Sequence, residues 1–274
     1  MKPMTLEEVH DVLYDILVDI HEFCVDNNIK YSLAGGTLLG AIRHNGFIPW
    51  DDDIDIQLSR PEYEKFIHSY KSKKGYQLFS REIEGNEDLS IAFTRICEME
   101  KTYVDTGELP WRNNPTGLWI DVVPIDGAPS NRLLARIRIF IMYITWRIML
   151  LIRHANNNEI KNVSSFTKKM KLFVKKGIVK ILPKDMVLRY IFMCQRYNFV
   201  DSKYLANYST MQNKFREWQP QSTMLKFSLH KFENGEFWIM EDYNTSLTSL
   251  YGDYMKLPPK EKQVAHIENS YFWK

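Results

Sequence analysis

The sequence predicts an α+β fold in which helices flank a mixed β-sheet and a helical insertion interrupts the later part of the chain. Short apolar runs with strand-like alternation, as at 53–56 and 118–123, are separated by segments with helical periodicity. From about residue 131 to 200 the apolar pattern is helical throughout. We therefore expect three parts. Residues 1–130 form a core, residues 131–200 form a basic, amphipathic helical insertion, and residues 201–274 complete the core.

Composition places the chain among globular proteins that can bury a full-sized core. It has 274 residues, of which 45% are hydrophobic and 26% charged, and this excludes a disordered chain. The net charge of +2 is small, so only local clusters of charge carry information about partners. Cys24, Cys97 and Cys194 are too widely spaced for a disulfide framework or a zinc site, and we expect them to be reduced core residues.

The N-terminal segment has the pattern of a surface helix. Thr5 and Glu8 have capping-box spacing, and apolar residues then recur at helical period to about residue 27. Acidic residues every few positions leave no uninterrupted apolar run, so we expect neither a signal peptide nor a membrane span here. The protein should then remain in the cytoplasm.

Further elements follow from local patterns along the chain. Pro61 begins a helix that reaches about Tyr70. Strands are expected at 75–79 and 91–96, and a last helix at 243–250 ends at a Gly.

A Gly-Gly pair stands between a short strand and a helix. Residues 31–34 have the composition of a buried strand, and Gly35 and Gly36 break it. Thr37 is placed to cap the helix that follows. The free N–H groups of its first turn would favour phosphate.

A strand with alternating carboxylates comes next, after the acidic residues Asp51 and Asp52. Side chains at positions i and i+2 of a strand share a face, so Asp53 and Asp55 should point one way while Ile54 points into the core. Two such carboxylates would repel by a few kcal/mol at about 4–5 Å unless a cation neutralises them. Oxygen ligands suit Mg²⁺ or Mn²⁺ better than zinc. A solvated acidic turn is the alternative, which the preceding Gly-Gly turn and the alternation disfavour.

One acidic residue interrupts the apolar strand that is expected near residues 118–123. Asp121 needs a partner there, because burying an unpaired carboxylate costs several kcal/mol. A metal ion shared with the first two carboxylates would provide one. Asp126, which precedes a Gly, is expected to cap the turn that ends the strand.

The order of these motifs resembles a known family. Gly-Gly followed by an Asp-x-Asp strand resembles the nucleotidyltransferase superfamily, and GGTLLGAIRHNGFIPWDDDIDI resembles its LicD family, to which fukutin and fukutin-related protein are distantly related. Residues 120–126 match an Ile-Asp-x-x-Pro-x-Asp segment of LicD-like proteins, and YGDYMKLPPKEK resembles their closing segment. Two departures bear on the substrate pocket: residues 238–240 lack the usual proline, and Gln263 replaces a common basic residue.

The resemblance implies a nucleotidyltransferase-like catalytic core and a metal-dependent transferase. Such an enzyme would move phosphocholine from CDP-choline to a hydroxyl of a cell-surface glycan precursor, of the teichoic acid or lipo-oligosaccharide type, and release CMP. Asp53, Asp55 and Asp121 are the implied catalytic residues and ligands of Mg²⁺ or Mn²⁺. Asp121 is also the candidate to orient or deprotonate the attacking hydroxyl.

Several further residues are expected to bind the donor. Backbone amides of the Gly-Gly turn would hold phosphate oxygens, basic side chains would neutralise them, and aromatic faces would hold the quaternary ammonium of choline. The expected substrate-binding residues are Gly35, Gly36, Thr37, Arg43, His44, Trp50, Asp51, Arg95 and Trp119, with Tyr103 and Trp111 as further members of an aromatic box.

The insertion has an unusual distribution of charge. Residues 132–153 are strongly apolar, but Arg136, Arg138 and Arg147 argue against a membrane span. Residues 166–181 form an amphipathic helix rich in lysine, which either binds an anionic membrane surface or is an ordinary surface helix. The lysines lack interleaved aromatic residues, so no nucleic-acid partner is expected. A lipid-linked glycan acceptor would place the protein at the inner face of the cytoplasmic membrane.

Other functions remain compatible with the same residues. Ribitol phosphate or glycerol phosphate could replace phosphocholine as the transferred group. A nucleotidyltransferase that acts on a protein or small molecule would use the same carboxylates. A non-catalytic, membrane-associated scaffold is disfavoured by the intact acidic triad.

Overall fold

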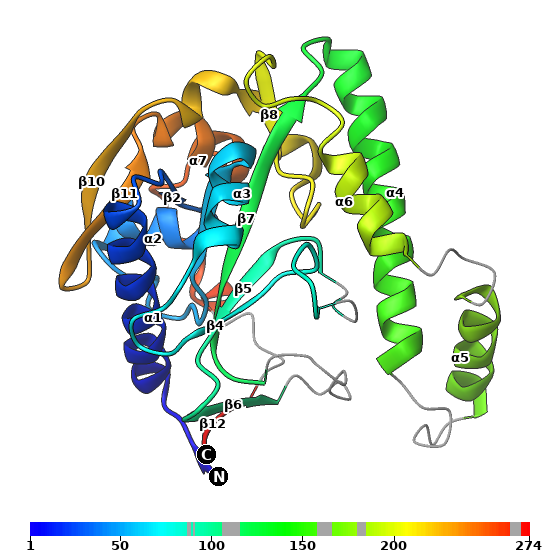
Figure 1. Cartoon of the computed structure of the whole chain (residues 1–274), viewed down its shortest axis with the longest axis horizontal. Helices are drawn as coiled ribbons and strands as arrows, with labels where there is room; N and C mark the ends of the chain where they lie inside the picture. Colours follow the sequence, from blue (N-terminus) through cyan, green and yellow to red (C-terminus); the bar gives the residue numbers. More distant parts are fainter. Residues whose placement is uncertain (87–88, 90, 106–115, 158–165, 180–184, 264–269) are drawn as a thin grey trace.

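The computed structural model describes residues 1–86, 89, 91–105, 116–157, 166–179, 185–263 and 270–274. It confirms the expected α+β class, with a curled mixed sheet flanked by helices (Figure 1). The central strands run in the order β2, β3, β7, β5, β4, of which β3 and β7 are parallel and the other pairs antiparallel. Their bounds are β2 Ser32–Leu33, β3 Asp55–Ser59, β7 Trp119–Ala128, β5 Thr94–Cys97 and β4 Gln77–Phe79.

The remaining strands extend this sheet or form small sheets beside it. The far end of β7 pairs with β8, which pairs with β9. β12 lies between β1 and β6, so the two chain ends meet in one small sheet (Figure 1). β10 and β11 form a separate hairpin. The bounds are β8 Tyr204–Ala206, β9 Gln219–Pro220, β1 Lys2–Pro3, β12 Ser270–Trp273, β6 Thr102–Asp105, β10 Phe227–Phe232 and β11 Gly235–Met240.

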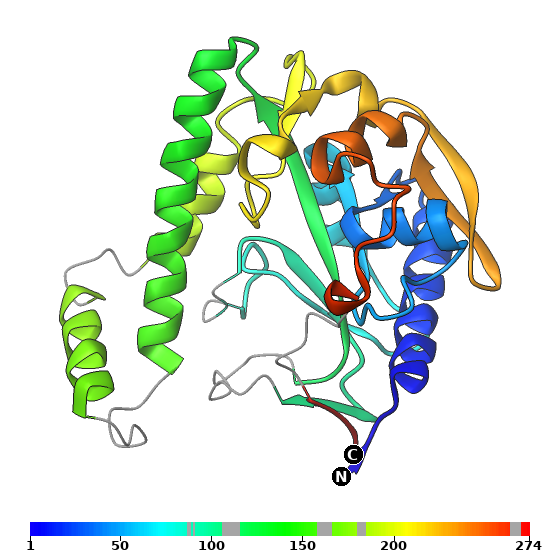
Figure 2. The ribbon, with the colours of Figure 1, turned by 180° about the vertical axis from the view of Figure 1, so that it is seen from behind.

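The helices of the core pack around this sheet (Figure 2). α1 begins with the expected capping box, in which the Thr5 side chain accepts from the Glu8 amide and the Glu8 carboxylate accepts from the Thr5 amide. Its apolar side, including Leu13 and Leu17, is buried in the main core. The bounds are α1 Leu6–Asp26, α2 Gly35–His44, α3 Arg60–Ser69 and α7 Tyr243–Tyr251, with short 3₁₀ turns at Lys214–Glu217, Gln221–Met224 and Lys260–Lys262.

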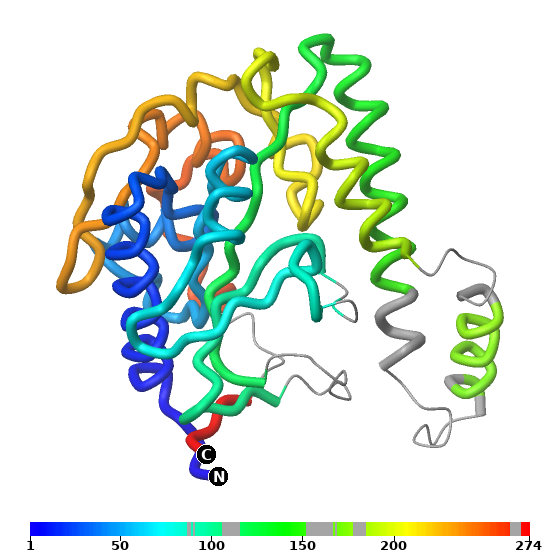
Figure 3. Tube along the Cα trace, viewed as in Figure 1, coloured from blue at the N-terminus to red at the C-terminus, as the bar shows by residue number. Residues whose placement is uncertain are grey.

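The insertion forms a helical layer beside the sheet. It consists of α4 Arg132–Asn157, α5 Phe166–Val179 and α6 Met186–Cys194. α4 runs along one side of the molecule, and α5 lies at its outer edge (Figure 3). A second apolar cluster joins α4 and α6 to the segment that carries β8. Over the residues that the structure describes, no helix has the length and apolar content needed to cross a membrane.

Most of the expected elements are present, but several strands differ from the prediction. β3 begins at Asp55 and β5 at Thr94, so each is shorter at its start than the sequence predicted. The hairpin of β10 and β11 was missed, although the Asn234-Gly235 turn between alternating residues marks it. The three cysteines are free and buried, as expected.

The prediction that Asp126 caps a turn was wrong. Asp126 lies within β7 and is only 1% exposed. Two nitrogens of Arg60 donate to its two carboxylate oxygens, at 2.8 and 2.9 Å. The strand continues through Pro124 because this residue falls between the stretch of β7 that pairs with β5 and the stretch that pairs with β8, so no ladder hydrogen bond is lost there.

Candidate functional site

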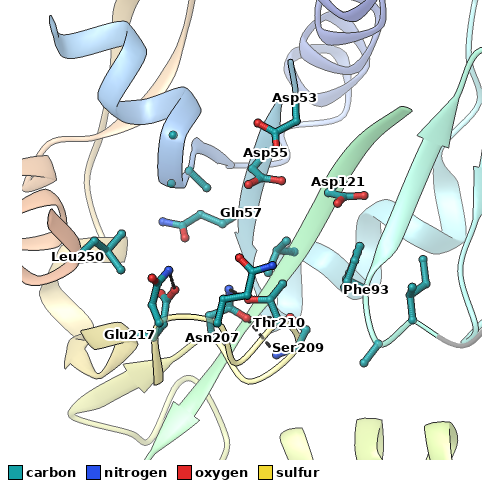
Figure 4. Close-up of a pocket in the computed structure, with 18 of the residues that line it drawn as sticks. Asp53, Asp55, Gln57, Phe93, Asp121, Asn207, Ser209, Thr210, Glu217 and Leu250 are labelled. Carbon is teal, nitrogen blue, oxygen red and sulfur yellow. Dashed lines mark hydrogen bonds between the residues drawn. The ribbon is translucent and has the colours of Figure 1, made fainter. Parts of the chain in front are cut away.

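A pocket of about 370 Å³ lies over the sheet where β3, β5 and β7 adjoin (Figure 4). The Gly-Gly start of α2 and the acidic loop before β3 form one wall. α4, α7 and residues 207–217 form the others. The pocket therefore combines segments from both ends of the chain with the helical insertion.

Three carboxylates gather on the sheet side of this pocket. Asp53 precedes β3, Asp55 begins it, and Asp121 is directly opposite Asp55 on the parallel strand β7. Figure 4 shows all three around the same space. Desolvation, together with the charges of neighbouring acids, raises the pKa of Asp53 to about 8 and that of Asp55 well above its usual range.

One cation reaches this group of carboxylates. Arg95 is directly opposite Asp121 on β5, and its Nε donates to the Asp121 Oδ1 at 2.9 Å. Its guanidinium also lies over the ring of Trp119, 4.1 Å from the ring centre. In the described part of the chain, no Lys or Arg lies within ion-pair distance of Asp53 or Asp55. Burial and like charges therefore act on Asp53 and Asp55 without an ion pair from the described residues to offset them.

The acidic loop is held from two sides. The Nε2 of His10 lies 2.7 Å from the backbone oxygen of Asp51, and the His10 ring stacks on Phe47. The hydroxyl of Tyr271, in β12, donates to the Asp52 carboxylate. No local sequence pattern indicates this contact, because His10 lies 41 positions from Asp51.

The Gly-Gly turn lies next to the Asp51 carboxylate. A Cβ on Gly36 would lie 2.8 Å from the Asp51 Oδ2, so a side chain there would displace the carboxylate. Gly35 has φ of +51°, a conformation that favours glycine. Thr37 does not cap α2 as expected. Ala34 is the cap residue, and the Thr37 hydroxyl accepts from the Asp55 amide at 2.9 Å, which fixes the start of β3.

Three of the predicted substrate-binding residues lie together outside the pocket lining. Arg43 donates to the His44 ring at 2.9 Å and to the Tyr254 backbone oxygen at 3.0 Å. The ring of Trp50 stands edge-on to His44. These contacts connect the end of α2 to the segment after α7.

Among the described residues, the expected members of the aromatic box have separate partners, and none of them lines the pocket. Trp119 is covered by Arg95, Trp50 packs beside His44, and Tyr103 lies on β6 near Phe272. Trp111 lies outside the described residues. The aromatic residues that do line the pocket are Phe93, Trp146 and Tyr251.

Sequence reasoning also missed the polar wall opposite the carboxylates. It is built by the segment after β8 and the 3₁₀ turn at Lys214–Glu217 (Figure 4). Burial raises the pKa of Glu217 to about 7, although the Asn213 amide donates to it at 2.8 Å. The uncharged polar residues of this wall are Asn207, Ser209, Thr210, Gln212 and Asn213.

The three carboxylates expected to bind a metal ion have different surroundings. Within the described residues, no three His, Cys, Asp or Glu side chains are grouped as the ligands of a bound ion would be. Asp121 is paired instead with Arg95. Asp53 and Asp55 supply carboxylate oxygens, the donors that Mg²⁺ and Mn²⁺ prefer.

Comparisons with known proteins point to one family. Residues 28–121 match the family described as LicD/FKTN/FKRP, nucleotidyltransferase domain. The chain is 31% identical over 289 aligned residues to the lipopolysaccharide cholinephosphotransferase LicD of Haemophilus influenzae, and the alignment covers 99% of each protein. An uncharacterised protein of Rickettsia prowazekii is 38% identical over 76 residues, and one of Rickettsia typhi is 42% identical over 69. These two alignments each cover 24% of this chain, and 29% and 22% of the two proteins.

Proposed function

This chain belongs to the LicD family of transferases, and we propose that it transfers phosphocholine from CDP-choline to a hydroxyl of a cell-surface glycan precursor, releasing CMP. The proposal is supported by full-length similarity to a protein named as a lipopolysaccharide cholinephosphotransferase. The structural observation that carries it is the row formed by Asp55, Asp121 and Arg95 on three adjacent strands. This row offers both anionic and cationic groups to a diphosphate.

A divalent cation, Mg²⁺ or Mn²⁺, fits the acidic side of the pocket. Asp53 and Asp55 would hold it, because burial and their mutual repulsion raise the pKa of both carboxyl groups and a bound cation would offset both effects. Asp121 could join them if it shared its oxygens with Arg95. When bound, such an ion neutralises negative charge on the diphosphate and on the departing phosphate.

The chain's own residues would perform the remaining steps. Arg95 would pair with oxygens of the phosphate that carries choline. Asp121 would accept the proton of the acceptor hydroxyl, whose oxygen attacks that phosphorus. A new phosphorus–oxygen bond forms to the acceptor as the bond to the CMP oxygen breaks, so phosphocholine moves and CMP leaves. The backbone at Gly35 and Gly36 lies close enough to the site to contact the diphosphate.

Two parts of the pocket lining suit the two ends of the donor. The uncharged polar wall around Asn207 and Thr210 offers hydrogen bonds for a nucleoside. Phe93 and Trp146, with Met149 and Leu150 of α4, form an aromatic and apolar wall. A trimethylammonium group cannot donate hydrogen bonds, so it is best held by such a wall. We therefore propose these residues for choline in place of the aromatic box expected from the sequence.

The test is a donor panel with CDP-choline, CDP-ribitol and CDP-glycerol, each with and without Mg²⁺ and with a glycan extract as acceptor. We expect Mg²⁺-dependent CMP release and a raised Tm with CDP-choline. Asp55→Asn should abolish release, whereas Asp201→Asn, which changes an exposed carboxylate outside the pocket, should not. Selective turnover of another donor would reassign the transferred group. Nucleotide found in the product would indicate a nucleotidyltransferase, and a failure to bind any donor would contradict catalysis.

A further inference from the structure

α4 carries a stripe of large apolar side chains that face away from the protein. Leu133, Ile137, Phe140 and Ile144 recur at the spacing of one helix face, and they are 43–67% exposed. Leu134 and Ile141 lie beside them and are also exposed. An ordinary surface helix would place polar residues on this side.

The opposite side of α4 packs against the rest of the protein. Ile139 and Met142 are buried in the second apolar cluster, and Ala135 on the same side is also buried. Farther along, Trp146 and Met149 line the pocket that holds the carboxylates. α4 is therefore apolar on both sides. The body of the protein covers one side, and on the other the stretch from Ile144 to Leu151 adjoins Lys175 of α5.

α5 continues this pattern at the outer edge of the molecule (Figure 1). Its Phe173 is 66% exposed, and Met170 and Val174 are also exposed, whereas Leu172 is 4% exposed. The apolar side predicted from the sequence is thus turned outward at these positions rather than packed on the body. This arrangement disfavours an ordinary surface helix that exposes only its lysines.

The charged side chains of α4 and α5 all carry positive charge. Arg132, Arg136 and Arg147 of α4 and Lys171 of α5 are exposed. Neither helix contains an Asp or Glu. Cations beside an apolar stripe complement an anionic bilayer, which attracts the charges and accepts the apolar side chains. A second copy of the chain fits less well, because it would bring the same arginines face to face.

We infer that the exposed sides of α4 and α5 dock this protein on an anionic lipid surface, with α4 lying along the interface. The arginines would stay at the level of the headgroups while Phe140 and its neighbours enter the acyl boundary. Since the other side of α4 lines the pocket, docking would bring the pocket close to the membrane. The use of this proximity in catalysis rests on the proposed function, with a lipid-linked glycan precursor as acceptor, whereas the docking itself does not.

The experiment is vesicle flotation of the full-length protein with no donor or acceptor present. We expect binding to vesicles that contain phosphatidylglycerol and much weaker binding to phosphatidylcholine alone. Phe140→Ser combined with Ile144→Ser, or Arg147→Glu combined with Lys171→Glu, should each weaken binding about tenfold or more. All four side chains are exposed, so both variants should keep the wild-type Tm.

Matched controls lie on the opposite part of the molecule. Leu225→Ser removes an apolar side chain that is 58% exposed, and Lys226→Glu with Lys231→Glu reverses two exposed charges near the hairpin. Both should bind vesicles like the wild type. Equal loss in the controls, or wild-type binding in the α4 and α5 variants, would overturn the inference. A concentration-dependent dimer that Phe140→Ser with Ile144→Ser dissolves, without vesicle binding by the wild type, would identify a second copy as the occupant instead.

Discussion

Arg95 and Asp121 are paired across β5 and β7, with the Arg95 Nε 2.9 Å from the Asp121 Oδ1. On its other side, β7 pairs with β3, which places Asp55 directly opposite Asp121. Asp55, Asp121 and Arg95 therefore lie side by side on three adjacent strands, as two carboxylates followed by a guanidinium. Because Trp119 lies under the guanidinium, the position of Arg95 is fixed by stacking as well as by its hydrogen bond.

Replacing Arg95 should affect turnover more than folding. We expect Arg95→Met to lower kcat by about 10²-fold or more, since a charged contact to the phosphate is lost from a preorganised site. Arg95→Lys should recover little, because an ammonium cannot both stack on Trp119 and donate to Asp121 in the same way. CMP release under single-turnover conditions measures the effect. Arg196→Met, at an exposed arginine outside the pocket, serves as control and should retain full activity. Equal loss in this control would show that the effect is not specific to the site.

Replacing one pocket carboxylate by an amide should abolish activity without lowering thermal stability. We expect Asp55→Asn to abolish turnover and yet to raise or preserve Tm without divalent cations, because it removes a charge that its surroundings disfavour. Added Mg²⁺ should raise the Tm of the wild type and have little effect on this variant. Thermal denaturation with EDTA and with Mg²⁺ gives both comparisons. A strongly lowered Tm in EDTA would mean that Asp55 has a structural role instead.

The sequence allowed the carboxylates to be predicted because their placement depends on short-range rules. Asp53 and Asp55 are two positions apart and line the same pocket, although β3 begins only at Asp55. Asp121 is an acid within an apolar strand, which indicates a shared site. The same reasoning failed at Asp126, whose partner Arg60 lies 66 positions away. Local sequence could not distinguish a turn from a strand that continues past Pro124 to pair with β8.

The rest of the site depends on tertiary contacts that have no local pattern. Residues 207–217 reach the pocket because β8 returns to pair with the end of β7. Trp146 reaches it because α4 packs back toward the sheet. Neither segment contains a motif, and the sequence therefore pointed to Trp50 and Trp119, which lie near motifs but not in the pocket lining.

The ion pair between Arg60 and Asp126 should be important for stability. Breaking a buried pair leaves one charge without its partner, so we expect Asp126→Asn to lower the free energy of unfolding by about 3 kcal/mol or more. Urea denaturation measures this change. Glu64, which also contacts Arg60 but is 37% exposed, provides the control. Glu64→Gln should change stability by less than about 1 kcal/mol, and an equal effect of both substitutions would contradict the importance of burial.

Glu217 should make stability depend on pH. Burial raises its pKa in the folded protein to about 7 from an ordinary value of 4.5, so the folded state binds the proton more tightly than the unfolded state. The stability associated with this group is then fully present below about pH 4.5 and is lost as the pH rises to about 7. Unfolding measured at intervals across this window should show a smaller loss in Glu217→Gln than in the wild type. Glu236→Gln, at an exposed position on the hairpin, should leave the wild-type dependence unchanged.

Trp146 should distinguish CDP-choline from uncharged donors. Loss of an aromatic face next to a quaternary ammonium costs about 0.5–2 kcal/mol, so Trp146→Ala should raise KM for CDP-choline by about 2- to 30-fold. Trp146→Phe keeps an aromatic face and should recover much of the loss. For CDP-glycerol, which has no cation to place against the ring, both variants should differ little from the wild type. Steady-state CMP release with the two donors, with Trp238→Phe as a control on the hairpin, makes the comparison. If Trp146→Ala weakened both donors equally, the ring would be part of the general pocket wall and not of a choline subsite.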